Sequence, residues 1–132
     1  MVCRQRREQM EDLTVGQVEL IHNRIMREET GDSRVLSEAN LLQMVFRANL
    51  IPECLPRAAF IFFSLCAYPA FRAGNAGTAL AVTEWMLASG GYRITGEKTG
   101  IMALAEGILA FTTEPEEVDQ WIRNNTQKSV SR

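Results

Sequence analysis

The residues of this chain best suited to bind a ligand lie in the segment Phe71–Ala79, which reads FRAGNAGTA. Gly74 permits a tight turn, and Asn75 is a favourable N-cap for a helix that begins directly after it. The first N–H groups of that helix, up to Thr78, have no partner within the helix and attract anions. Arg72 would add positive charge. The segment therefore predicts either a capped turn between two helices or a weak phosphate site formed by Arg72, Gly74, Asn75 and Thr78.

Few other side chains could carry chemistry. His22 is the only histidine, which excludes a histidine-rich metal site and any mechanism that needs two imidazoles. We expect His22 to be a packed, hydrogen-bonded residue of a helix. The three cysteines, Cys3, Cys54 and Cys66, are widely spaced and form no Cys-x-x-Cys pair. We therefore expect structural thiols, with a reactive or metal-bound thiol as the alternative, and no metal site.

These residues must be positioned by helices, because apolar residues recur at helical spacing and no convincing strand pattern is present. Thr14 and Gln17 have the spacing of a capping box, so the first helix should begin at Thr14. Ser37 should cap a second helix. The expected buried side of this second helix consists of Leu41, Leu42, Val45 and Phe46.

Two later helices, at about 57–67 and 76–89, are apolar almost all round and should lie in the centre of the domain. Their expected core side chains are Phe60, Phe62 or Phe63, Leu65, Leu80, Trp85 and Leu87. A fifth helix near 100–110 and a sixth, capped by Thr113 with Glu116, complete an all-α bundle of six helices. Residues 30–36 or 92–95 could add a short extended piece.

The length of 132 residues fits one domain. We expect a polar N-terminal segment at 1–12, a helical domain at 13–125 and a flexible tail at 126–132. The net charge of -2 argues against nucleic acid as a partner. No apolar run reaches the roughly 20 residues of a membrane span, and the N-terminus lacks the apolar core of a signal peptide. These features predict a cytoplasmic protein without a membrane partner.

The segment FRAGNAGTA resembles the signature of the Fic/Doc (death-on-curing) family, which reads roughly His-Pro-Phe-x-Asp/Glu-Gly-Asn-x-Arg and opens a central helix. Other segments are similar to that family in the same order: LTVGQVELIHNRI to its first helix, VLSEANLLQ to its Leu-x-Glu-x-Ala-Leu stretch, MLASGGYRI to the end of the motif helix, and AEGILAFTTEPEEVDQWIRNN to the closing helix pair. The resemblance covers about Leu13 to Asn125 and implies a Fic/Doc-like helical bundle.

The chain departs from the family at each position that carries the chemistry. The family's catalytic histidine falls on Pro69, or on Tyr68 if one residue is inserted, and neither serves as a base near neutral pH. Its acidic metal ligand falls on Ala73, which has no ligand atom. The arginine that pairs with nucleotide phosphates falls on Gly77, and a second arginine of the Fic branch falls on Leu80.

The resemblance therefore implies a degenerate active site and a toxin-related, catalytically inactive pseudoenzyme that binds a partner. The family receives an extended target segment along a flap, which here would be residues 30–35. The alternative is an active transferase that moves AMP or phosphate from a nucleotide triphosphate to a protein hydroxyl, with an unusual base such as Glu84. We expect no cofactor beyond weakly bound ATP or phosphate. We expect a protein partner, either antitoxin-like or a target, and a homo-oligomer is a further option.

Overall fold

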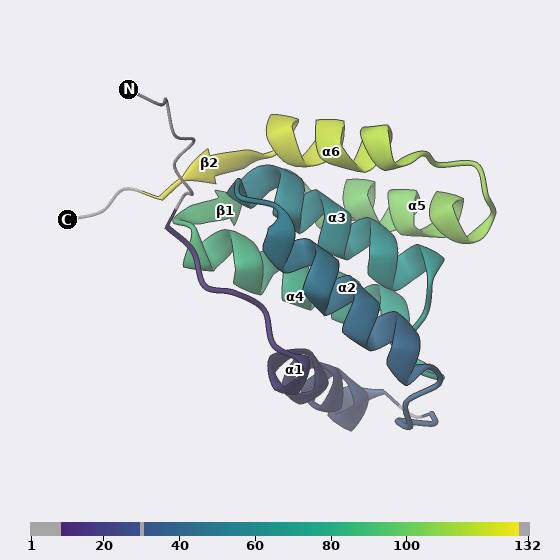
Figure 1. Cartoon of the computed structure of the whole chain (residues 1–132). Helices are drawn as coiled ribbons and strands as arrows, with labels where there is room; N and C mark the ends of the chain where they lie inside the picture. The colour runs from purple at the N-terminus through teal and green to yellow at the C-terminus, as the bar shows by residue number, and fades with distance from the viewer. Residues whose placement is uncertain (1–8, 30, 130–132) are drawn as a thin grey trace.

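The computed structural model describes residues 9–29 and 31–129, which form six helices and two short strands (Figure 1). The prediction of an all-α bundle is confirmed, with a minimal sheet added to it. The elements in chain order are α1 (Val15–Glu28), α2 (Glu38–Leu50), α3 (Cys54–Ala67), α4 (Asn75–Ser89), β1 (Tyr92–Ile94), α5 (Lys98–Leu109), α6 (Pro115–Asn124) and β2 (Thr126–Lys128).

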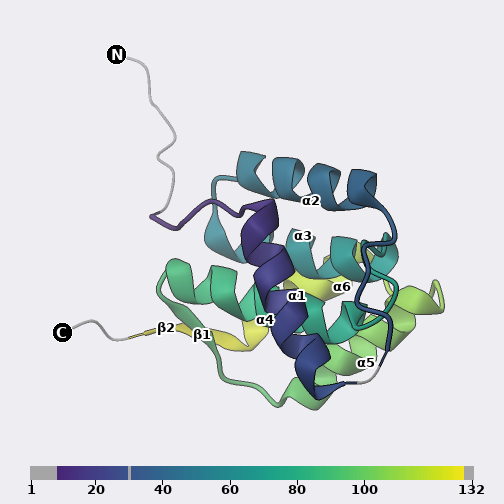
Figure 2. The same cartoon turned by 90° about the horizontal axis from the view of Figure 1, so that it is seen from below.

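Helix α3 is the centre of the bundle. It packs against α4, α6, α2 and α5, and nine of its residues are buried, including Ile61, Phe62 and Leu65. Helix α4 carries Val82, Met86 and Leu87 into the same core. Helix α1 lies across α4, as the view from below shows (Figure 2). The two helices that join at the candidate loop are thus the two most buried ones.

The predicted helix starts are confirmed where a short polar side chain caps the helix. The Thr14 hydroxyl accepts a hydrogen bond from the N–H of Gln17 at 3.0 Å. The Ser37 hydroxyl accepts one from the N–H of Asn40 at 3.1 Å. Each bond satisfies a backbone donor that has no partner inside its helix.

Two other helix starts differ from the prediction. Helix α3 begins at Cys54 rather than near residue 57, because Pro56 lies in its first turn, where a missing N–H costs no hydrogen bond. Helix α6 begins at Pro115 with Glu114 as N-cap and no side-chain capping bond, so the predicted Thr113 cap is wrong. Proline is favoured at the first helical position, since its fixed φ suits a helix.

The predicted buried side of α2 is half wrong. Leu41 and Val45 are buried, but Leu42 is 55% exposed and Phe46 is 67% exposed. The buried stripe runs instead through Leu41, Met44, Val45 and Ala48. This stripe has the narrow spacing of a helix that meets the core along a single line.

The core side chains expected from the two central helices fall into two groups. Phe62, Leu65 and Leu87 are fully buried. The others are only partly buried and pack against the edge of the core; they are Phe60, Phe63, Leu80 and Trp85. The central placement of α3 and α4 is confirmed, but each helix has one side that the bundle does not cover completely.

Both ends of the described chain are held more firmly than expected. Strand β2 pairs with β1 in antiparallel register, with Arg93 opposite Gln127, so residues 126–128 are not a flexible tail. At the other end, the Arg57 guanidinium is fully buried, bonds the carbonyl of Glu11 at 3.4 Å and forms an ion pair with Asp12 at 3.1 Å. The remainder of the expected segments, at 1–8 and 130–132, lies outside the described residues.

Candidate functional site

The loop between α3 and α4 forms a tight turn around Gly74. Gly74 has a φ of 77° in the left-handed region and is itself the N-cap of α4. Asn75 is therefore the first helical residue, and its predicted role as N-cap is wrong. Its side chain instead clasps the backbone of Phe71: Oδ1 accepts from the Phe71 N–H at 3.1 Å, and Nδ2 donates to the Phe71 carbonyl at 2.8 Å. Asn75 thus holds the turn closed with both of its polar atoms.

His22 of α1 packs directly against this loop. Its ring stacks on that of Phe71, with centroids 3.7 Å apart and an interplanar angle of 8°. Its Nε2 donates to the carbonyl of Ala73 at 2.9 Å, and the residue is only 1% exposed. The expectation of a packed, hydrogen-bonded histidine is confirmed. The crossing of α1 over α4 brings His22 to this loop.

Helix α1 also crowds the start of α4. A Cβ atom added to Gly74 would lie 2.6 Å from Met26 Sδ, closer than such contacts allow. A Cβ atom on Gly77 would lie 3.5 Å from Ile25 and 3.6 Å from Oε2 of Glu29. A phosphate that approached α4 at Gly77 would therefore meet a carboxylate, which opposes the attraction of the helix start for anions.

The residues of the possible phosphate site have different surroundings. The Arg72 side chain is 48% exposed and lies 3.8 Å from a carboxylate oxygen of Asp32. Thr78 is fully buried, and its hydroxyl finds no hydrogen-bond partner in the described part of the chain. Only Arg72 and the backbone around Gly74 are thus placed to meet an anion from solvent. Weak binding of ATP or phosphate here remains a prediction.

The residues that the resemblance aligned with catalytic positions have different surroundings. Tyr68 is the C-cap of α3 and is 62% exposed. The carbonyl of Pro69 accepts a hydrogen bond from Nδ2 of Asn40 at 3.1 Å. Glu84, the base of the alternative mechanism, forms an ion pair with Lys98 at 2.7 Å.

The segment proposed as a flap pairs with the same turn. Val35 forms an isolated antiparallel bridge with Phe71, and the Arg72 N–H donates to the carbonyl of Arg34 at 3.0 Å. At its tip, Asp32 accepts hydrogen bonds from Arg34, and these bonds hold the pKa of Asp32 well below its usual range. One edge of the flap is therefore already occupied by the chain itself.

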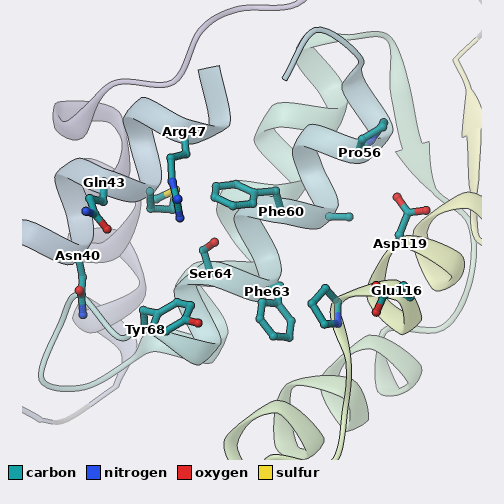
Figure 3. Close-up of a pocket in the computed structure, with 13 residues that line it drawn as sticks. Asn40, Gln43, Arg47, Pro56, Phe60, Phe63, Ser64, Tyr68, Glu116 and Asp119 are labelled. Carbon is teal, nitrogen blue, oxygen red and sulfur yellow. The ribbon is translucent and has the colours of Figure 1, made fainter. Parts of the chain in front are cut away.

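A groove with a volume of about 680 Å³ lies along the outer face of α3. Helix α2 forms one wall, the start of α6 forms the other, and α3 forms the floor (Figure 3). We call it the α2–α6 groove. Its lining residues are Asn40, Gln43, Met44 and Arg47 from α2, Pro56, Ala59, Phe60, Phe63, Ser64 and Tyr68 from α3 and its end, and Pro115, Glu116 and Asp119 from α6.

The two walls of the α2–α6 groove carry opposite charges. Arg47 extends from α2 toward the floor, and Glu116 and Asp119 lie on the α6 side (Figure 3). Asp119 is paired with Arg123 at 2.7 Å. Within residues 9–29 and 31–129, neither Arg47 nor Glu116 has an ion-pair partner. The groove thus combines an aromatic floor with one unpaired charge of each sign.

Sequence reasoning missed this groove. The prediction places Phe60, and Phe62 or Phe63, in the core, because α3 is apolar almost all round; Phe60 and Phe63 are only partly buried. A helix of this kind predicts burial on all sides, but it does not reveal which side is covered by a neighbouring helix.

Several chemical classes find no support in the described residues. No group of three histidine, cysteine, aspartate or glutamate side chains there is close enough to hold a metal ion. No helix in the same ranges combines the length and apolar character needed to cross a bilayer.

No protein-family model matches the chain, and no curated protein matches it at a significant level.

Proposed function

We propose that this chain is a catalytically inactive, partner-binding protein of the cytoplasm, built on a Fic/Doc-like bundle with a degenerate active site. The observation that carries the proposal is the α2–α6 groove, which has an aromatic floor and unpaired charges on its walls. Exposed apolar surface of this kind, rimmed by polar residues, marks sites of protein interaction.

The turn before α4 supports the inactive half of the proposal. A Fic/Doc-like reaction needs a general base, a metal ligand and a phosphate clamp, and Tyr68 or Pro69, Ala73 and Gly77 stand at those positions. Losing a general base alone costs about 10² to 10⁴-fold in rate, and losing the metal removes further charge stabilisation. The turn keeps the residues that shape it, Phe71, Gly74 and Asn75, whose contacts are structural.

Site-specific photocrosslinking in cells tests the binding half. A photoreactive phenylalanine analogue at Phe63, on the groove floor, should give a discrete crosslinked species. The same analogue at Phe111, which is 93% exposed and outside the groove, is the matched control. We expect the Phe63 adduct to disappear when Arg47→Glu is added. Equal adducts at both positions, or none at Phe63, would contradict partner binding at the groove.

Incubation with labelled ATP and magnesium, followed by intact-mass measurement, tests the inactive half. We expect no AMP or phosphate on the chain or on a crosslinked partner. Transfer of either group by the unaltered protein would instead favour the transferase alternative.

A further inference from the structure

The partner's chemistry can be specified further, and this step rests on the proposed function. We infer that the α2–α6 groove binds an amphipathic α-helix of the partner, with an acidic side chain facing α2 and a basic side chain facing α6.

The shape of the groove favours a helix. The floor residues Pro56, Phe60 and Phe63 recur every three or four positions along α3, so they form a ridge that a second helix can pack against. The floor extends from Pro56 to Tyr68, twelve residues along the chain at about 1.5 Å each. A ligand helix of about three turns would therefore cover it.

The walls disfavour an extended segment. Extended ligands gain most of their affinity from backbone hydrogen bonds to the edge of a sheet. The floor and both walls of this groove are helical, and the backbone groups within a helix bond to one another. An extended peptide would therefore lose water from its own N–H and C=O groups without replacing those bonds.

The charges define the two flanks of the ligand helix. Arg47 on α2 has no partner in the described ranges, so an acidic side chain on that flank would complete an ion pair. Glu116 is likewise free on the α6 side, next to Asp119, so a basic side chain suits the other flank. A ligand with one charge on both flanks would be repelled at one wall.

Three synthetic helices can test this pattern. Each is about 14 residues long, which gives roughly 21 Å of helix, and each carries the same leucine seam at heptad positions a and d. The first has glutamates on one flank and lysines on the other, the second has glutamates on both, and the third has lysines on both. A bound helix can reverse its direction, so a peptide with its two flanks exchanged would not be a clean control. The three peptides differ in which charges they carry, and reversal does not change that.

Fluorescence anisotropy with the full chain should rank the mixed peptide first. We expect it to bind about three- to fivefold more tightly than either single-charge peptide, the range typical of one partly exposed ion pair. In the Arg47→Glu variant the lysine-only peptide should become the tightest. Arg24→Glu makes the same charge change on an exposed position of α1 and should leave the order unchanged. Amide shifts on α3 and α6 locate the bound peptide.

Two outcomes would overturn the inference. One is equal binding of the three peptides, which would mean nonspecific apolar contact, and the other is no binding by any. If no peptide binds while the Phe63 crosslink persists and depends on Arg47, the helical ligand is refuted and partner binding stands. If the Phe63 crosslink is also absent, both proposals fail.

Discussion

Gly74 allows the contact between α1 and the turn to be measured as a free energy of unfolding. In Gly74→Ala, an alanine must adopt the left-handed φ of 77°, which costs about 1 to 2 kcal/mol. Its Cβ must also displace the Met26 sulfur, 2.6 Å away, and such overpacking costs about 1 to 3 kcal/mol. The loss of backbone freedom in the unfolded chain offsets about 0.4 to 1 kcal/mol. The net loss of stability should be about 1 to 5 kcal/mol.

The two contributions separate in a double-mutant cycle with Met26→Ala. Without the sulfur, Gly74→Ala should cost only its backbone strain less the unfolded-state gain, about 0 to 1.5 kcal/mol. The coupling energy between the two positions should therefore be about 1 to 3 kcal/mol. Urea denaturation followed by the helical circular dichroism signal gives all four stabilities.

Gly16 provides the matched control for this cycle. It lies in the first turn of α1, and a Cβ added there would meet no atom within 4 Å. Gly16→Ala should therefore stabilise the protein by about 0.5 to 1 kcal/mol. If Gly74→Ala is as stable as the unaltered protein, or if Met26→Ala does not reduce its cost, the close contact between α1 and the turn is wrong.

Three further predictions concern buried side chains. Phe62→Ala should cost about 3 to 5 kcal/mol, whereas Trp85→Ala should cost less because Trp85 is only partly buried; equal losses in urea denaturation would contradict the assigned burial. His22→Phe keeps a planar ring against Phe71 but leaves the Ala73 carbonyl without its hydrogen-bond donor. The free energy of unfolding should therefore fall by about 1 to 3 kcal/mol. An unchanged denaturation midpoint would refute the hydrogen bond. Burial raises the pKa of the Cys66 thiol to about 12. At about pH 8, near the ordinary thiol pKa, iodoacetamide should therefore modify Cys66 only after unfolding. Peptide mass mapping can show this.

Local capping signals were enough to place some elements from the sequence. The starts of α1 and α2 follow from Thr14 and Ser37, because each cap bonds a backbone N–H only three residues away. The predicted starts of α3, near residue 57, and of α6, after a Thr113 cap, differ from the observed ones, and in both helices a proline lies in the first turn. Residues within one helical turn decide where a helix begins. Proline at such a position is ambiguous, because it breaks a helix from within but is tolerated in its first turn.

Features that depend on distant contacts could not be predicted in this way. The polar segment 126–128 becomes a strand only because β1 supplies its hydrogen-bonding partners. Leu42 and Phe46 are apolar but face away from the core, since α2 contacts α3 along one line. The α2–α6 groove exists because α2 and α6 both pack on α3 and leave its outer face open between them. None of these arrangements has a local sequence signal.

The crossing of α1 over α4 decides what the residues of the Fic/Doc signature would meet if they were introduced into this turn. An arginine at position 77 would have to project past Ile25 and Glu29, whose side chains already stand 3.5 and 3.6 Å from the point where its Cβ would lie. A carboxylate at position 73 would arise beside the carbonyl that His22 now bonds. Both substitutions would place a new charged group against α1. A library designed to install the Fic/Doc signature in this turn should therefore also vary positions 22, 25, 26 and 29.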